Sequence, residues 1–356
     1  MYLELTDEQE FLAEAASGTL ARRDTLAAAR ESLDGASPLE LWGVAQEAGW
    51  TGLLSAEQVD GAELGAYDAI LVLEACGSRL ADAHLLGHLP AVTLIEAADH
   101  DDLELRRQLA AGEKRAALIE LIGCEQPGGA SAAPTVLLNG AAELVLDADG
   151  ADVFVVVGDS WGALVEASAP GVTVKPQPAY DATRALATVN FDSVAGRQLG
   201  LTQEIHCGRD LQRALLAAES VGAAEACLTM ARDYAIERRA FGRTIGSYQA
   251  IKHKIVEMMR RLENGRSLLV QAGRAYHQDA AEFALHANAA LVIASDALSF
   301  AAAENIFIHG GIGATWEHDA QLYYRRAEVS RRLAGGVDRA AETVAETLLN
   351  TAATRG

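Results

Sequence analysis

The chain has 356 residues, of which 50% are hydrophobic, so it is long enough to bury several cores in two or three structural units. Aromatic residues make up only 5%, a composition that favours packed helices over a large aromatic-rich sheet. The formal net charge of −21 makes the surface repel nucleic acid and anionic lipid, so neither is expected as a partner.

The cysteines and the N-terminus indicate the cellular compartment. The four cysteines, spread along the chain without a CxxC pair, predict neither a disulfide framework nor a zinc knuckle. They are Cys76, Cys124, Cys207 and Cys227. The first residues, MYLELTDEQEFL, are acidic, and no uninterrupted apolar run reaches membrane-spanning length. We therefore expect a cytoplasmic protein without a membrane anchor.

Residues 1–115 are predicted to form a helical domain. Thr6 is a suitable N-cap before an acidic first turn. Segments 38–49, 66–80 and 102–111 carry apolar residues at helical spacing, with loops where Gly and Pro gather between them.

Residues 116–200 are predicted to form a small β domain. Short β-rich runs follow one another here, separated by Gly, Pro and Asp turns. The runs are TVLLNG, AELVL, DVFVVV, ALVEA, VTVKP and ALATVNF. The last of them alternates as a half-buried strand requires.

Residues 205–356 are predicted to form a four-helix bundle. The four long helical patterns are 210–238, 248–277, 280–308 and 317–350. One apolar stripe on the second pattern is the seam expected of an antiparallel bundle. It contains Ile251, Ile255, Met258, Leu262 and Leu269. The expected fold class is therefore mainly α with a small β domain in the middle.

Residues 234–249 form a specific motif, YAIERRAFGRTIGSYQ. It resembles the ER-x-x-FG-x-x-I-x-x-x-Q segment of acyl-CoA dehydrogenases, in which Arg and Gln lie at a dimer interface and reach the pyrophosphate and adenosine of FAD bound mainly by the neighbouring subunit. The resemblance gives these roles to Arg238 and Gln249, with Phe241 and Ile245 completing the spacing. A guanidinium group suits diphosphate oxygens. The alternative interpretation is an ordinary solvated Arg-rich loop.

Residues 308–319, IHGGIGATWEHD, form a second motif. It is similar to the Gly-Gly-x-Gly loop of the same family, whose backbone packs against the ADP half of the interfacial FAD. The resemblance implies this role for Gly310 and Gly311. The glycines follow a predicted helix and not a strand, so a βαβ dinucleotide fingerprint is not expected. The Gln usual three residues before the Gly-Gly pair is Phe307 here.

With the order of the three regions, the resemblance covers nearly the whole chain. It implies the fold named acyl-CoA dehydrogenase-like and the FAD-dependent α,β-dehydrogenation of an acyl-CoA thioester. In this reaction a carboxylate removes the α-proton, the β-hydrogen passes as hydride to the flavin, and an electron-transfer flavoprotein-type acceptor reoxidises it.

The positions of the catalytic base depart from the family pattern. The usual Glu is replaced by Ala334, and the first-helix position that some members use is Gln212. Neither side chain can accept a proton, so no catalytic residue is assigned. The carboxylates nearby are Asp338 and Glu219, and such residues are more often surface or helix-pairing groups than displaced bases.

The β region departs as well. The family motif N-G-x-K-x-W-I-T, whose Trp and Thr touch the flavin, is replaced by NGAAELVL at 139–146. Residues 124–131, CEQPGGAS, resemble a degraded TEP-x-x-GSD loop. The missing residues would hold the isoalloxazine and acyl chain within one subunit, whereas the remaining ones would hold the ADP half across an interface.

This pattern resembles the catalytically degenerate subunit of actinobacterial heteromeric acyl-CoA dehydrogenases of steroid catabolism. The first hypothesis is therefore a non-catalytic subunit of a heterotetramer, which shares FAD with a homologous catalytic partner. The alternatives are a homo-oligomeric dehydrogenase with a relocated carboxylate base, and a structural or assembly subunit without flavin. A steroid-derived acyl-CoA as substrate rests on analogy alone.

Other charged or metal-binding residue types carry weaker signals. His84 and His88 have i, i+4 spacing, but Gly87 intervenes and no third ligand is evident, so no metal site is expected. Three histidines are expected to be structural: His206, His309 and His318. Four arginines form a basic cluster: Arg325, Arg326, Arg331 and Arg332. Helix pairing at an oligomer interface explains this cluster as well as ligand binding does.

Overall fold

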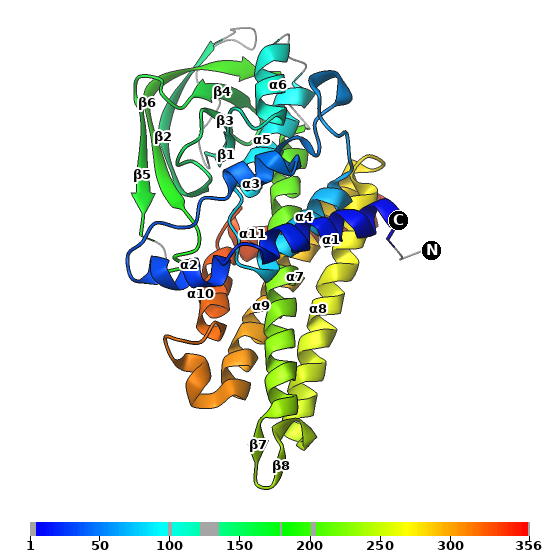
Figure 1. Ribbon diagram of the computed structural model, residues 1–356. Coiled ribbons are helices and arrows are strands. Elements are labelled where there is room, and N and C mark those ends of the chain that lie inside the picture. The colour runs from blue at the N-terminus through cyan, green and yellow to red at the C-terminus, as the bar shows by residue number, and fades with distance from the viewer. Residues whose placement is uncertain (1–4, 99–101, 122–134, 179, 201–203, 355–356) are drawn as a thin grey trace.

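A computed structural model describes residues 5–98, 102–121, 135–178, 180–200 and 204–354. The chain is mostly helical with one small sheet region, which confirms the expected fold class. A long helical bundle forms one end of the molecule, and the sheet packs beside its other end (Figure 1).

The N-terminal part consists of short helices that cross the bundle. Thr6 caps the first helix, because its Oγ1 accepts a hydrogen bond from Gln9 N at 3.2 Å and the Gln9 side chain accepts one from Thr6 N. The helices are α1 (Asp7–Ala21), α2 (Thr25–Leu33), α3 (Trp42–Glu47), α4 (Ala66–Ser78), α5 (Leu85–Ala97) and α6 (Leu103–Ala110), with the 3₁₀ turns η1 (Trp50–Gly52) and η2 (Glu57–Val59).

The sheet has the strand order β1-β3-β4-β6-β2, and β5 also pairs with β6. Only β1 and β3 are parallel among these pairs. The strands are β1 (Ala116–Glu120), β2 (Thr135–Leu146), β3 (Val153–Val157), β4 (Gly162–Glu166), β5 (Val172–Gln177) and β6 (Leu186–Leu199).

The runs TVLLNG and AELVL are one strand, β2, and not two. Its pairing with β6 shifts between Leu138 and Gly140 and again between Ala142 and Val145. Gly140 and Leu144 have φ angles of 134° and 54° at these irregularities. A bulge bends a strand without ending it, so the glycine that indicates a turn in the sequence marks a bend here.

The C-terminal part is built on three long helices and two shorter ones. The elements are α7 (Glu204–Glu237), β7 (Arg239–Ala240), β8 (Arg243–Thr244), η3 (Ile245–Ser247), α8 (Gln249–Ala275), α9 (Ala280–His309), η4 (Gly310–Ala314), α10 (Ala320–Ser330) and α11 (Gly336–Thr354). β7 and β8 form a hairpin that joins α7 to α8.

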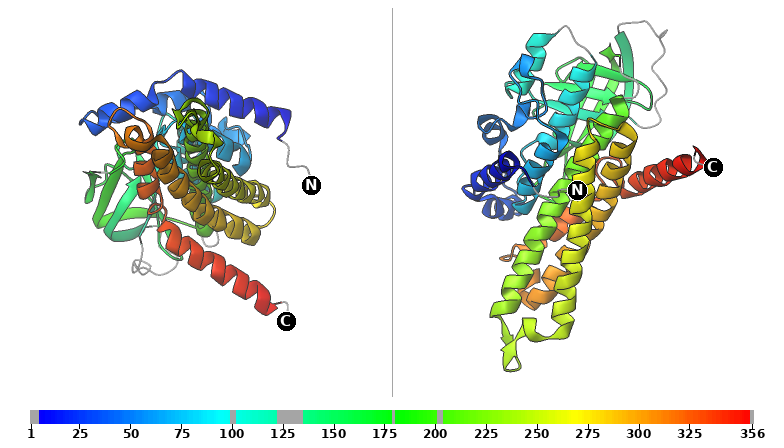
Figure 2. Two further views of the ribbon diagram at one scale, coloured as in Figure 1. Left: turned by 90° about the horizontal axis from the view of Figure 1, so that it is seen from below. Right: turned by 90° about the vertical axis from the view of Figure 1, so that its right-hand side faces the viewer.

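The expectation of one helix over 317–350 is wrong, because α10 and α11 are separate. Ala334 and Gly335 between them, and Gly336 at the start of α11, have φ angles of 54°, 84° and 81°. These left-handed values cannot continue an α-helix, and two glycines adopt them at little cost. The chain turns here, and α11 projects away from the bundle (Figure 2).

The helix α4 crosses α7 at close range. A Cβ atom added to Gly77 on α4 would lie 1.9 Å from the backbone oxygen of Glu219, and one added to Gly222 on α7 would lie 1.9 Å from that of Glu74. Only glycine fits at both positions, so the crossing fixes the N-terminal helices against the bundle.

By length and composition alone, two helical segments could cross a membrane: α7 and Ala280–Ala314. Their apolar windows are 72% and 50% buried inside the protein. They pack along each other in the bundle, so their composition is that of core helices.

Candidate functional site

Gln212 on α7 and Ala334 in the loop before α11 line the same pocket. Its volume is about 260 Å³, and it lies between the sheet, α7 and this loop. The wall from β2 includes Leu144 and Leu146, which stand where the sequence lacks the flavin-contacting Trp and Thr. Both base positions and the replaced flavin contacts therefore meet at one place.

The loop that carries Ala334 is held in position from α7. Arg213 Nε donates a hydrogen bond to Ala334 O at 3.1 Å, and Arg213 Nη1 donates one to Asn288 Oδ1 on α9 at 2.7 Å. Gln212 Nε2 donates to Leu86 O on α5 at 3.1 Å. These contacts fix both sides of the pocket, but neither Ala334 nor Gln212 places a basic group in it.

Glu120, the last residue of β1, also lines this pocket. Its Oε1 lies 2.7 Å from Arg209 Nε and 3.0 Å from Arg339 Nη1. Two guanidinium groups thus engage the carboxylate and link β1 to α7 and α11. The sequence prediction missed this residue, and the only signal for it is a charged side chain at the end of the apolar run AALIE.

Glu219, one of the two carboxylates considered as a relocated base, is buried in an ion-pair network away from this pocket. Its Oε1 lies 2.7 Å from Arg326 Nη1, and its other oxygen pairs with Arg184. Arg326 Nε also lies 2.5 Å from Asp181 Oδ2. A carboxylate with two buried guanidinium partners is not free to act on a substrate. The other candidate, Asp338, is exposed in the first turn of α11 and does not line the pocket either.

The grouping of Arg326 with Arg325, Arg331 and Arg332 in one basic cluster is wrong. Arg326 is 1% exposed and is among the largest fully buried side chains of the described chain. Besides its two carboxylate partners, it donates hydrogen bonds to Leu80 O and to Thr183 Oγ1. Its neighbours Arg331 and Arg332 are exposed, so the four arginines do not act as one group.

The residues expected to hold FAD lie at the opposite end of the bundle. Arg238 follows α7 and begins the hairpin, where Arg238 O accepts a hydrogen bond from Ile245 N at 2.8 Å. Phe241 at the hairpin turn is 96% exposed. Gln249, also exposed, begins α8.

Gly310 and Gly311 belong to the same end. The Tyr234 ring, one turn before Arg238, stacks on His309 with the ring centroids 4.3 Å apart. This contact joins the end of α7 to the end of α9, where Gly310 follows His309 directly. The structure thus brings the two sequence motifs to one end of the bundle.

This end, which we call the bundle tip, is open and carries several exposed hydrophobic side chains beside exposed polar ones. A Cβ atom added to Gly242, Gly310 or Gly311 would meet no atom within 4 Å. An exposed apolar surface of this kind is typical of a protein interface. Its large exposed hydrophobic side chains are Ile236, Phe241, Val256, Met259, Phe307, Ile312 and Trp316.

The pocket and the bundle tip are far apart in one chain. Gln212 and Glu237 lie 25 residues apart on the continuous helix α7. At about 1.5 Å per residue they are separated by roughly 38 Å. Figure 1 shows α7 running from the sheet to the hairpin. This distance is too long for one FAD to join the pocket and the tip of the same chain.

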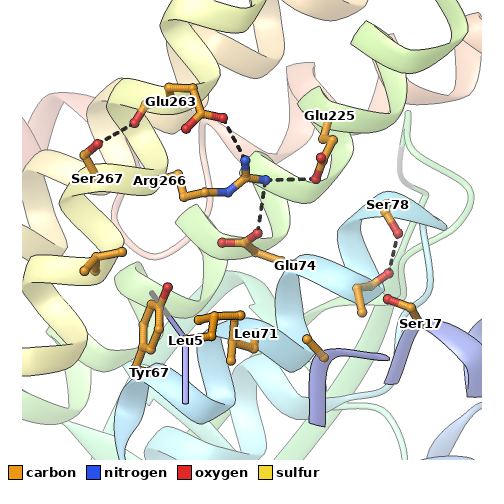
Figure 3. Close-up of a pocket in the computed structure, with 13 residues that line it drawn as sticks. Leu5, Ser17, Tyr67, Leu71, Glu74, Ser78, Glu225, Glu263, Arg266 and Ser267 are labelled. Carbon is orange, nitrogen blue, oxygen red and sulfur yellow. Dashed lines mark hydrogen bonds and ion pairs between the residues drawn. The ribbon is translucent and has the colours of Figure 1, made fainter. Parts of the chain in front are cut away.

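A second cavity, of about 460 Å³, contains none of the predicted site residues. In Figure 3 the Arg266 guanidinium on α8 points to Glu74 on α4, Glu225 on α7 and Glu263. Burial raises the pKa of the Glu74 carboxyl to about 7. This cavity therefore contains an ion-pair cluster between helices. It shares no lining residue with the pocket of Gln212 and Ala334.

The histidine pair His84 and His88 does not form a common site. His88 Nδ1 accepts a hydrogen bond from Ala116 N at 3.1 Å, and its ring lies edge-on to Trp42. His84 faces Glu40 and Asp147 instead. Burial lowers the pKa of His88 to about 4, so this ring is neutral at physiological pH.

The degraded loop at 124–131 and Cys124 lie outside the described residues. The three other cysteines are free thiols. His309 packs between Tyr234 and His318, in agreement with a structural role.

Comparison with protein families identifies similar proteins. The family model described as "Acyl-CoA dehydrogenase, C-terminal domain" matches residues 206–349. The chain is 32% identical over 342 residues to "Acyl-CoA dehydrogenase IpdE2" of Mycolicibacterium smegmatis, an alignment that covers 93% of this chain and 96% of that protein.

Solved structures share the whole architecture. One chain of the ChsE4-ChsE5 complex from Mycobacterium tuberculosis superposes with a TM-score of 0.87 at 22% identity and covers 98% of this chain and 99% of its own length. A chain of the Tcur3481-Tcur3483 steroid ACAD gives the same TM-score and the same coverages at 23% identity. At these identities the likeness concerns the fold.

Proposed function

This chain belongs to the acyl-CoA dehydrogenase family, and on that basis we propose that it is the non-catalytic subunit of a heteromeric, FAD-dependent acyl-CoA dehydrogenase. Its bundle tip holds the ADP half of an FAD whose isoalloxazine ring lies in the pocket of a homologous catalytic partner. That partner supplies the carboxylate base, and the assembly is a cytoplasmic heterotetramer.

The observation that carries the proposal is the separation of the two half-sites. Arg238 lies just beyond the end of α7, whereas Gln212 and Ala334 lie at the pocket roughly 38 Å away along that helix. The tip of this chain therefore serves a pocket in another subunit. Neither usual base position of this pocket holds a carboxylate, and Glu120 in its wall is engaged by Arg209 and Arg339, so a second chain provides the base.

The residues of the tip fit the ADP half of the cofactor. The exposed Arg238 offers a guanidinium fork to the pyrophosphate, and Gln249 offers an amide to the adenosine part. The backbone at Gly310 and Gly311 is open to a ligand, because no atom lies within 4 Å of an added Cβ. Bound FAD supplies the hydride acceptor of the reaction.

The pocket of this chain fits the isoalloxazine half less well. Leu144, Leu146 and Ala334 offer only apolar side chains where a flavin needs polar contacts. A bulky, steroid-derived acyl-CoA is the proposed substrate of the complex, supported by the likeness to a steroid ACAD, and an electron-transfer flavoprotein-type acceptor is the proposed oxidant.

The test is co-expression with a homologous catalytic acyl-CoA dehydrogenase chain from the same organism, followed by a count of FAD per chain. We expect little FAD on this chain alone and about one FAD per two chains in the complex. An isolated chain that carries stoichiometric FAD and oxidises an acyl-CoA by itself would overturn the proposal.

Arg238→Ala in the complex separates this proposal from a purely structural subunit. Loss of a charged hydrogen bond of about 1.5–3 kcal/mol predicts roughly 10-fold to 150-fold weaker FAD retention. Arg232→Ala is the matched control, because Arg232 is also exposed on α7 and, within the described part of the chain, its ion pair is with the exposed Asp233. Equal FAD retention in both variants would favour the structural subunit.

A further inference from the structure

Three buried side chains outside the pocket form a compact cluster: Asp82, His84 and Asp147. Asp82 and His84 lie in the loop before α5, and Asp147 directly follows β2. We propose that these residues bind a divalent transition-metal ion of the Zn²⁺ type. This inference does not depend on the proposed function.

The potential ligand atoms lie close together, and two of them, His84 Nδ1 and Asp147 Oδ1, face each other as an ion pair. One atom from each residue falls within 4.8 Å of the other two. The residues are 7%, 8% and 2% exposed in the order Asp82, His84, Asp147. Within the described part of the chain, no hydrogen bond reaches Asp82 Oδ2, His84 Nδ1 or Asp147 Oδ1. Buried polar atoms are rarely left in this state, and a shared ligand explains all three.

The spacing of the imidazole and one carboxylate suits a small ion. His84 Nδ1 lies 3.4 Å from Asp147 Oδ1, longer than a charged N–H···O bond of about 2.7–2.9 Å. Tetrahedral ligands about 2.0–2.1 Å from a zinc ion lie about 3.4 Å from each other. The Asp82 ligand atom also lies within 4.8 Å of these two atoms, so one ion can reach all three residues.

The groups around the cluster hold its ligands in orientation. Glu40 Oε1 lies 3.4 Å from His84 Nε2, which directs the other ring nitrogen, Nδ1, to the cluster. A metal-bound histidine typically has such a carboxylate on its second nitrogen. Asp147 Oδ2 accepts a hydrogen bond from Gly87 N at 2.6 Å, which leaves Oδ1 for the ion.

The charge of the cluster matches a divalent ion. Asp82 and Asp147 together carry two negative charges, and His84, which must be neutral to ligate an ion, then adds none. Glu40 pairs with Arg115 at 3.2 Å, and the buried Arg326 is paired with Asp181 and Glu219. A buried pair of carboxylates requires compensation, and one M²⁺ ion supplies it in full.

The site would connect the loop before α5 to the end of β2. Leu146, the neighbour of Asp147, lines the pocket, and Leu86 on α5 accepts the hydrogen bond of Gln212. A bound ion therefore stabilises one wall of the pocket without touching it.

The experiment is a zinc titration of the chelator-treated full chain. We expect one Zn²⁺ per chain by elemental analysis and a rise in Tm with added Zn²⁺, because the ion binds the folded state alone. Co²⁺ in place of Zn²⁺ should give the visible absorption of a tetrahedral N/O site. Asp147→Asn should abolish stoichiometric binding, whereas Asp149→Asn, an exposed carboxylate two residues away, should not.

Glu40→Gln keeps the test valid if Asp147→Asn fails to fold. The Glu40 side chain is 59% exposed, so we expect this variant to retain the fold. Loss of the carboxylate that orients His84 predicts about 10-fold to 100-fold weaker Zn²⁺ binding. The proposal is overturned if the wild-type chain takes up no Zn²⁺ at micromolar concentration. In that case a proton on His84 Nδ1 bridges to Asp147 in place of an ion. Equal Zn²⁺ uptake by wild type and Asp147→Asn also overturns it.

Discussion

The two ends of α7 differ in how their charged side chains are satisfied. Beside the N-terminal half, Glu219, Arg326 and Asp181 are buried and pair with one another. At the C-terminal end, Arg238 and Phe241 are exposed. Charges that are satisfied within the chain hold its own fold together, whereas exposed groups at an open tip are available to a second molecule. Substitutions at the first end should therefore change stability, and those at the second should change binding.

Arg326→Met should give the largest effect. The substitution leaves Asp181 and Glu219 buried without their shared guanidinium, which predicts a loss of about 3–5 kcal/mol in the free energy of unfolding. Urea denaturation of the purified chain measures it. Arg331→Met is the matched control, because Arg331 is exposed, and should change stability by less than about 0.5 kcal/mol. Similar values for both variants would remove the contrast between the two ends.

The buried carboxyl group of Glu74 should make the free energy of unfolding depend on pH. Burial raises its pKa from 4.5 to about 7 in the folded chain, so between these values the folded state retains a proton that the unfolded state has lost. Its contribution to stability is therefore present below pH 4.5 and is lost as the pH rises to 7, by at most about 3 kcal/mol. Unfolding of wild type and Glu74→Gln at pH 5 and pH 8 checks this, since the variant should lack this part of the pH dependence. An unchanged pH dependence would contradict it.

Phe241→Ser tests the tip as an interface. The side chain is 96% exposed, so its loss should leave the unfolding free energy unchanged, whereas the mixed complex should dissociate about tenfold more readily. Sedimentation of the co-purified complex measures the association. Phe11→Ser on α1, where the side chain is 73% exposed, is the control. Equal behaviour of the two variants would place the partner elsewhere.

Asp338→Asn should have the smallest effect. Asp338 is exposed and does not line the pocket, so turnover of the mixed complex should stay within about twofold of wild type. A loss of about 10²-fold to 10⁴-fold, the usual effect of removing a general base, would instead restore the relocated-base hypothesis.

The helices and most of the strands could be predicted because their signals are local. Met258, Leu262 and Leu269 recur at helical spacing, and all three are buried on α8. The break between α10 and α11 was not predicted, since the apolar pattern continues on both sides of Ala334. The helix is interrupted there because three successive residues have left-handed backbone conformations.

The motifs at Arg238 to Gln249 and at Gly310-Gly311 were visible in the sequence because each depends on close spacing within one segment. That Gln212 and Ala334 share a pocket was not visible, because α7 and the loop before α11 are distant in the chain and meet only through packing. The same holds for Glu120, whose two arginine partners come from α7 and α11.

By itself, the sequence determined the family, the mainly helical architecture with its small sheet, and the absence of a carboxylate at both usual base positions. Periodicity, turn residues and short motifs carry this information locally. Only the tertiary structure decided that Arg326 is buried, that Glu219 is engaged, and that Asp82, His84 and Asp147 meet. The choice of partner for a charged side chain depends on which segments pack together, and no local pattern encodes it.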